Sequence, residues 1–218
     1  MNRLTNAIRR PGARWALLGV IVLVALAVAI WPRGDSGGPA AQPSTKPLDT
    51  ATLVARRDTA RLAPCPPAPA GGLPGKGPLA AVSLRCLADG GIVTDLAAAL
   101  AGKPALLNLW AYWCEPCAHE LPELRAYAER ARSAITVLTV HSDAGENQAL
   151  ARLASLDVRL PGVLDPDAQI RAAVGAPAVL PVSVLIRADG SIARVVVRQF
   201  TGVDDIAATV RSELGVAA

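Results

Sequence analysis

The sequence predicts an α/β domain in which a mixed central sheet is flanked by helices. Two apolar segments, 105–111 and 134–140, are separated by a helix-like segment, so we expect parallel strands joined by a right-handed crossover. Two later segments, 182–186 and 192–197, are joined at Asp189-Gly190, a signal for an antiparallel hairpin. Apolar residues make up 52% of the chain, which is enough for a sizeable core.

The first residues of the chain predict export across a membrane. Residues 16–30 are apolar apart from Gly19, and as a helix residues 15–31 would span roughly 25 Å, at the short end of the membrane-spanning range. Trp15 and Trp31 flank this run, as is typical of the two membrane interfaces. Four arginines precede the run and place the N-terminus in the cytoplasm: Arg3, Arg9, Arg10 and Arg14.

A cleaved signal peptide is the alternative to an uncleaved anchor. Ala25-Leu-Ala27 and Ala27-Val-Ala29 resemble small-residue cleavage sites. The apolar run is longer than an ordinary signal-peptide core of about 7–15 residues, which favours the anchor. Both alternatives export the rest of the chain.

Three regions follow along the chain. We expect a cytoplasmic tip with an N-terminal membrane anchor over 1–33, a tether over 34–62 and the α/β domain over 63–218. Residues 32–50 are rich in Pro, Gly, Ser and Thr, a composition typical of a flexible linker, and 51–62 favours a short helix.

The N-terminal part of the domain is expected to start with a Pro- and Gly-rich loop over 63–78. Alternating apolar and polar residues predict a strand over 81–86, and Asp89-Gly-Gly91 predicts a turn after it. Thr94 is expected to cap a short helix over 95–100.

The remaining elements follow from apolar periodicity. They are helices over 114–132, 146–156, 167–174 and 203–214 and a short strand at 163–164. No internal repeat is present.

Charge argues against a nucleic-acid partner. The formal net charge is +4, but five arginines and no acidic residue lie in the first 33 residues. Without these five, the chain holds 17 basic and 18 acidic residues, a balance of −1. The folded part is therefore nearly neutral, and its charge gives no reason to expect a nucleic-acid partner.

The motif Trp113-Cys-Glu-Pro-Cys117 carries the most chemical information. Two cysteines three positions apart fit one helical turn, and their place between a strand and a helix is typical of a redox site. Cys114 would lie at the helix N-terminus, where the helix dipole favours a thiolate, so it is the expected nucleophile. Cys117 would resolve the mixed disulfide. Trp113 is expected to shield the pair, and Pro116 suits the first helical turn.

Two further cysteines, Cys65 and Cys86, lie upstream of the motif. An even number of cysteines in an exported domain suggests two disulfides. We expect Cys65 and Cys86 to form a structural disulfide, and a second redox pair that relays electrons is the alternative. A zinc site is disfavoured because these two cysteines are too far apart in the sequence to form a close-set ligand pair.

A family resemblance is carried by two segments, Asn108-Leu-Trp-Ala-Tyr-Trp-Cys-Glu-Pro-Cys-Ala-His-Glu-Leu-Pro122 and Leu180-Pro-Val-Ser-Val-Leu-Ile186 followed by Asp189-Gly190. With these segments the chain resembles the membrane-anchored TlpA/ResA type of thioredoxin-like protein, and the resemblance covers about 79–216. It implies a thioredoxin fold with an N-terminal extension and a helical insertion over 142–178. It also implies that Pro181 is a cis-proline facing the disulfide, and that Glu120 tunes the cysteine pair and helps to recognise partner proteins.

Glu115 points toward a reductant. A carboxylate beside the cysteines disfavours a second negative charge, so it should raise the thiol pKa values. A less stabilised thiolate makes the dithiol a better electron donor. A surface acid favoured by the helix dipole is the alternative role of Glu115. We expect His119 to be a solvated helix residue and His141 to be structural.

We therefore expect an extracytoplasmic, membrane-anchored thiol-disulfide oxidoreductase, a single-pass and monomeric protein that needs no cofactor or metal. It would take electrons from a membrane donor and reduce exported proteins, and the resemblance suggests apocytochrome c among them. A disulfide-introducing oxidase of the same fold is the enzymatic alternative. A non-catalytic binding module is the other, although it would not need both cysteines. A peroxidase is disfavoured because Ala111 and Leu107 stand where that class carries Thr or Ser and Pro.

Overall fold

The computed structural model describes residues 23–24, 50–68, 75–93 and 95–217. The membrane anchor expected over 15–31 lies outside these residues, apart from Leu23 and Val24, and remains a prediction. Among the helices that the structure describes, none combines the length and the apolar character needed to cross a membrane. The chain divides into Met1–Lys46 and Pro47–Ala218, and the fold below is that of the second unit.

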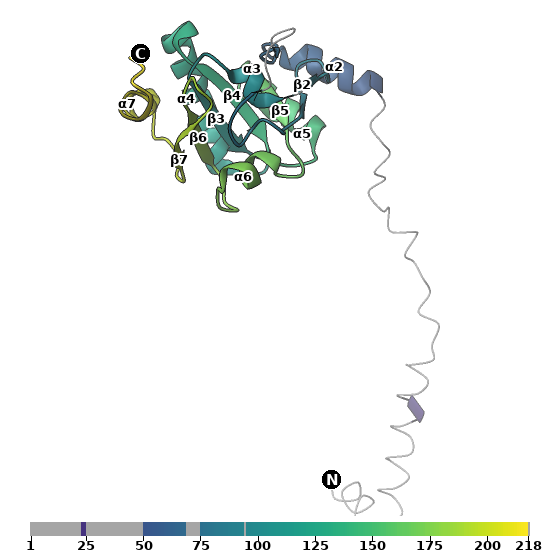
Figure 1. Ribbon diagram of the computed structural model, residues 1–218. Coiled ribbons are helices and arrows are strands. Elements are labelled where there is room, and N and C mark those ends of the chain that lie inside the picture. The colour runs from purple at the N-terminus through teal and green to yellow at the C-terminus, as the bar shows by residue number, and fades with distance from the viewer. Residues whose placement is uncertain (1–22, 25–49, 69–74, 94, 218) are drawn as a thin grey trace, which may run out of the picture. The chain divides into compact units, whose positions relative to one another are not determined.

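One mixed sheet forms the centre of this unit (Figure 1). Its strand order is β2-β1-β5-β4-β3-β6-β7. The strands are β1 (Leu84–Cys86), β2 (Ile92–Val93), β3 (Ala105–Trp110), β4 (Thr136–His141), β5 (Gly162–Leu164), β6 (Val182–Ile186) and β7 (Ile192–Val196). The β3–β4 and β4–β5 pairs are parallel and the other pairs are antiparallel. The predicted parallel pair and the late hairpin are both confirmed.

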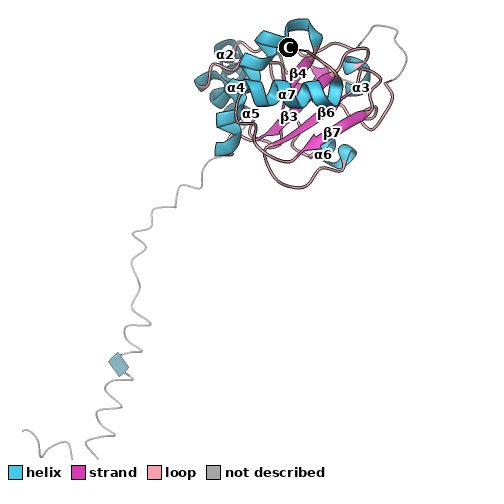
Figure 2. Ribbon diagram, turned by 90° about the vertical axis from the view of Figure 1, so that its left-hand side faces the viewer, coloured by secondary structure: helices cyan, strands magenta, loops and turns pink. Residues whose placement is uncertain are grey.

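Helices cover both faces of the sheet. They are α2 (Thr50–Ala60), α3 (Leu96–Leu100), α4 (Glu115–Ala131), α5 (Glu146–Ser155), α6 (Gln169–Val174) and α7 (Val203–Leu214), with a 3₁₀ turn at Arg132–Ala134. The apolar side chains of α4, α5 and α7 share one core with Leu106 and Trp110 of β3. Those of α3 and α6 share a second core with Leu107 and Leu109. Figure 2 shows α7 crossing in front of the sheet.

The two cores explain the sequence of the central strand. All six residues of β3 are buried, because successive side chains point into opposite cores. Only Asn108 interrupts its apolar run, and it pairs across the sheet with Ser183 of β6. Because both residues are polar and buried, each requires a hydrogen-bond partner inside the protein.

The β6–β7 hairpin depends on a glycine. Gly190 has φ +85°, a region that side chains rarely adopt, and a Cβ there would lie 2.7 Å from the carbonyl oxygen of Lys76. The turn is closed by hydrogen bonds from Gly190 N–H to the Arg187 carbonyl and from Ser191 N–H to the Asp189 carboxylate. The close approach lets the hairpin pack against the loop that precedes β1.

The local structure differs from the sequence predictions at four places. The strand expected over 81–86 is confined to 84–86, because Val82 N–H bonds to Leu79 and the Val82 carbonyl accepts from Leu96 of α3. Strand β2 was not predicted, because it has two residues and depends on pairing with β1. The helix expected over 167–174 begins at Gln169, since the Asp165 carboxylate accepts the N–H groups of Gln169 and Ile170.

The fourth difference concerns the cap of α3. Thr94, the expected capping residue, lies outside the described residues. The Asp95 carboxylate accepts the Ala98 N–H at 3.0 Å, which is the capping bond, and the Gly75 N–H at 2.8 Å. The Asp95 carboxylate thus connects the backbone at Gly75 to the first turn of α3.

The segment before the sheet is attached at two places. The short helix expected over 51–62 is α2, which packs against α5 and forms an ion pair between Arg57 and Glu146. A disulfide joins Cys65 to Cys86 of β1, with 6.0 Å between their Cα atoms. These attachments hold residues 50–68 against the domain.

Candidate active site

The cysteine motif lies where the central strand passes into its helix. Strand β3 ends at Trp110, a short turn follows, and α4 begins at Glu115 with Pro116 in its first turn. Cys114 is the N-cap of α4, and its Sγ accepts the N–H of Cys117 at 3.3 Å. This bond and the helix dipole would stabilise a thiolate on Cys114.

Cys114 and Cys117 form a disulfide, with 5.3 Å between their Cα atoms. Cys114 is 6% exposed and Cys117 is fully buried. An attacking or attacked sulfur must be reachable, so this difference supports the predicted division of roles, with Cys114 outermost.

The neighbours of the disulfide form an exposed apolar rim. Trp113 is 59% exposed, and its indole N–H donates to the Asp143 carboxylate at 3.1 Å. The Leu180–Pro181 peptide bond is cis, as the resemblance implied. Leu180 and Trp113 line the same groove, so the segment before Pro181 lies beside the motif.

His141 holds the motif turn to the end of β4. Its Nε2 accepts the Tyr112 N–H at 3.2 Å, and its Nδ1 is 2.9 Å from the carbonyl oxygen of Asp143, so the ring is a neutral imidazole with its proton on Nδ1. The ring packs edge-on against Trp110 at 4.8 Å. Burial lowers the pKa of His141 to about 4, although the Asp143 charge and hydrogen bond oppose this shift. The predicted structural role of His141 agrees with these contacts.

Glu120 is fully buried one turn after Cys117. Its carboxylate accepts from the Asn108 side-chain amide and from the Phe200 N–H, each at 3.0 Å. Asn108 also donates to the Ser183 hydroxyl at 3.2 Å, which accounts for the paired polar residues in β3 and β6.

Burial raises the pKa of Glu120 to about 7, while the hydrogen bonds from Phe200 and Asn108 and the charge of Arg198 hold it lower than burial alone would. Glu120 therefore gains or loses a proton near neutral pH. Because it is buried, a direct contact with a partner protein would require its exposure. In two otherwise apolar strands, the polar residues Asn108 and Ser183 form a hydrogen-bonded row that ends at the Glu120 carboxylate.

Glu115 lies on the surface and its charge is shared. Arg152 of α5 donates to its carboxylate at 2.8 Å, and His119 Nε2 lies 3.7 Å from the other oxygen. His119 is exposed, as predicted. Sequence reasoning missed Arg152, which lies 37 residues away on another helix. The cation reduces the effect of Glu115 on the cysteines.

The Cys65–Cys86 disulfide is remote from the motif in the sheet. Cys86 belongs to β1, and β5 and β4 separate β1 from β3. Adjacent strands are about 4.8 Å apart, so β1 and β3 are separated by about 14 Å. Direct exchange between the two disulfides would require a large movement.

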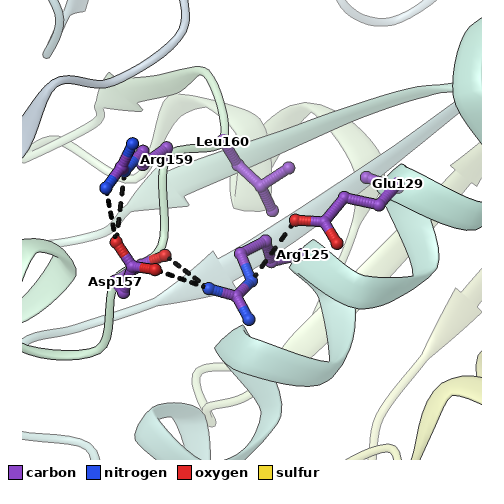
Figure 3. Close-up of a pocket in the computed structure, with 6 residues that line it drawn as sticks. Arg125, Glu129, Asp157, Arg159 and Leu160 are labelled. Carbon is purple, nitrogen blue, oxygen red and sulfur yellow. Dashed lines mark hydrogen bonds and ion pairs between the residues drawn. The ribbon is translucent and has the colours of Figure 1, made fainter.

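Two cavities differ in chemical character. A groove of about 390 Å³ next to the motif, called here the Trp113 groove, is lined by Leu109, Trp113, Ser142, Arg171, Ala178, Val179 and Leu180. Another pocket of about 400 Å³ lies farther along α4 (Figure 3). There Arg125 pairs with Asp157 and Glu129, and Arg159 pairs with Asp157. Since these charges neutralise one another, the described residues that line this pocket leave no unpaired charge for a ligand.

The comparisons with known proteins agree with the fold and the motif. The Redoxin family profile matches residues 74–210. The thiol-disulfide oxidoreductase ResA of Bacillus subtilis (strain 168) is 32% identical over 105 residues, which are 47% of this chain and 57% of the relative. A ResA of Bacillus cereus is 28% identical over 119 residues, 50% of this chain and 67% of the relative. The chain thus matches little more than half the length of the first relative.

Two solved structures are similar in fold. A secreted Mycobacterium tuberculosis disulfide oxidoreductase homologous to E. coli DsbE has 27% identity and a TM-score of 0.52, with 61% of this chain and 96% of that chain covered. The structure of MTB dsbF has 23% identity and a TM-score of 0.56, with 63% and 98% covered. The second likeness concerns the fold alone, which is thioredoxin-like.

Proposed function

Because the chain belongs to the redoxin family, we propose that it is a thiol-disulfide oxidoreductase that acts on protein disulfides through Cys114 and Cys117. The observation that carries the proposal is the disulfide at the N-terminus of α4, in which Cys114 keeps a small exposure of 6% and Cys117 is fully buried. The ResA relatives named as thiol-disulfide oxidoreductases support it.

The reaction needs only the two cysteines. In the reduced protein, the Cys114 thiolate attacks one sulfur of a client disulfide, and the other client sulfur leaves as a thiolate. The Cys117 thiolate then attacks Sγ of Cys114, which breaks the mixed disulfide and releases the second client thiolate. Two electrons pass to the client, and the protein ends with the Cys114–Cys117 disulfide.

Glu120 is suited to handle the proton of Cys117. The two residues are buried in consecutive turns of α4, and the Glu120 pKa of about 7 lies near working pH. As a carboxylate, Glu120 would accept the proton that Cys117 must lose before it attacks. The same negative charge disfavours a thiolate on Cys117 and so makes the dithiol a better electron donor.

We therefore propose that the protein reduces the disulfides of its clients. We also propose that it acts outside the cytoplasm. The apolar run over 15–31 with its preceding arginines supports a membrane-anchored, exported domain. The secreted disulfide oxidoreductase of similar fold supports export. The proposed clients are exported proteins with disulfides, among them apocytochrome c. The proposed electron donor is a membrane protein.

Replacing the outer cysteine tests the assignment. Cys114→Ser should abolish the reduction of insulin disulfides by the full chain, because no accessible nucleophile remains. Cys117→Ser is the matched control: it should form the mixed disulfide with insulin and accumulate it, since the resolving sulfur is lost. Turnover by the Cys114→Ser variant at the wild-type rate would refute the nucleophile assignment.

The direction of electron transfer is tested by measuring the redox state of the two cysteines in living cells. A reductase should hold Cys114 and Cys117 mostly as thiols, which an alkylating reagent of high mass reveals as a gel shift. Mostly oxidised cysteines would favour the disulfide-introducing oxidase instead.

A further inference from the structure

The Trp113 groove combines an apolar wall with one charge. Trp113 is 59% exposed and Val179 is 50% exposed, so two large apolar side chains that line the groove meet solvent. Arg171 is the one charged side chain among the described residues that line it. A segment that enters the groove therefore meets apolar surface and a single cation.

The backbone that carries Arg171 is firmly held. Helix α6 begins where the fully buried Asp165 accepts the Gln169 and Ile170 N–H groups, at 2.7 and 3.0 Å. Ile170, next to Arg171, is fully buried in the core beneath α6. The backbone position of Arg171 is thus fixed by the fold, so this part of α6 needs no ordering when a ligand binds.

The guanidinium of Arg171 forms no ion pair with the described part of the chain. The residue as a whole is half-buried, and no carboxylate within 50–68, 75–93 or 95–217 pairs with its guanidinium. Several other arginines of the described domain pair with acids, such as Arg57, Arg125, Arg152 and Arg198. A guanidinium left unpaired in a partly apolar groove favours an external carboxylate.

The groove also lies where a client would pass. Trp113 directly precedes Cys114, and Leu180 directly precedes the cis-proline, so residues next to a client cysteine at Cys114 would enter it. We propose that Arg171 selects clients that carry an Asp or Glu within two residues of the cysteine that Cys114 attacks. This inference rests on the proposed function and names the substrate class of that same site.

The expected preference is modest and depends on salt. A partly exposed ion pair contributes little, so a Glu-containing client should react about three- to fivefold faster than its Gln counterpart, and a Lys-containing client more slowly than either. Added salt should reduce the preference, because it screens exposed charges.

The test uses disulfide-linked homodimers of one short peptide, in which both sulfurs are equivalent. Glu, Gln or Lys is placed in turn at each of the two positions on either side of the cysteine. The reduced full-length protein, in detergent, is mixed with each dimer, the reaction is stopped with acid, and the free peptide is quantified by chromatography to give the second-order rate constant of a single reduction. Wild type is compared with Arg171→Gln, Arg171→Lys and Arg171→Glu. Arg194→Gln on the edge strand β7 is a control with the same loss of charge.

Wild type and Arg194→Gln should prefer the Glu peptide at one or more positions. Arg171→Lys should keep part of this preference, Arg171→Gln should lose it, and Arg171→Glu should favour the Lys peptide. Equal rates for the Glu, Gln and Lys peptides in wild type, or a preference unchanged in Arg171→Gln, would overturn the inference while leaving the proposed function intact. Failure to reduce any peptide or insulin would overturn both.

Discussion

Burial shifts the pKa values of two titratable side chains, Glu120 and His141, in opposite directions. The pKa of Glu120 is raised to about 7 and that of His141 is lowered to about 4, with desolvation as the main cause of each shift. Both groups are therefore held in their neutral forms over part of the range in which an unfolded chain would charge them. Each shift couples folding to pH.

The signs of the two couplings differ. Between about pH 4.5 and 7, folded Glu120 retains a proton that the unfolded chain loses, so its contribution to stability falls as pH rises through this window. Between about pH 4 and 6.5, unfolded His141 binds a proton that the folded chain does not, so its contribution rises with pH. The two trends oppose each other over the shared part of the range.

Substitutions should reveal these opposing trends. In Glu120→Gln, the His141 trend remains alone, so the free energy of unfolding should rise between pH 4.5 and 6.5 relative to wild type. In His141→Gln it should fall over the same range, and each change should amount to roughly 3 kcal/mol across the window. Urea unfolding of the full chain, followed by circular dichroism at several pH values, measures both. Parallel pH profiles for wild type and both variants would contradict the pKa shifts.

At the scale of elements, the ion pair between Glu115 and Arg152 connects the redox helix α4 to α5. Removing the cation in Arg152→Gln leaves an unbalanced negative charge beside Cys114, so the reduction potential should become more negative. Glu115→Gln should make it less negative, in the direction expected from the sequence. Because the pair is largely exposed, each shift should be on the order of 10 mV.

Equilibration of the full chain with glutathione buffers measures these potentials. Glu129→Gln is a suitable control, since this exposed acid lies near the other end of the same helix. Shifts of the same sign for Arg152→Gln and Glu115→Gln would rule out the electrostatic explanation.

Elements with strong local patterns could be predicted, and those set by distant partners could not. Strands β3 and β4, the β6–β7 hairpin and helices α4 and α7 carry apolar periodicity or turn residues of their own. Strand β2 has only two residues and exists through its pairing with β1. The same distinction holds in the site. The motif identified both cysteines, and the resemblance identified Pro181, but no local pattern connects Arg152 or Arg171 to Cys114.

At the scale of the whole domain, the Cys65–Cys86 disulfide attaches the segment after α2 to the sheet. It closes a loop between residues 21 positions apart, so its loss should increase the entropy of the unfolded chain. The double variant Cys65→Ser/Cys86→Ser should therefore be less stable by about 3 kcal/mol in urea unfolding. It should still reduce insulin, because the Cys114–Cys117 pair is untouched.

A relay of electrons through Cys65 and Cys86 would give a different result. The folded double variant, checked by circular dichroism, would then lose reduction by its physiological donor but keep reduction by dithiothreitol. Unimpaired activity with both donors would leave the structural role as the sole one for this disulfide.

The two tryptophans at the end of β3 occupy contrasting surroundings. Trp110 is fully buried, and Trp113 is 59% exposed next to the disulfide. A disulfide quenches the fluorescence of a nearby indole, so Trp113 emission should brighten on reduction, whereas Trp110 emission should shift to longer wavelength only on unfolding. With Trp15 and Trp31 replaced by Phe, one emission spectrum would follow the oxidation state and the folded fraction of the same molecule without an added dye.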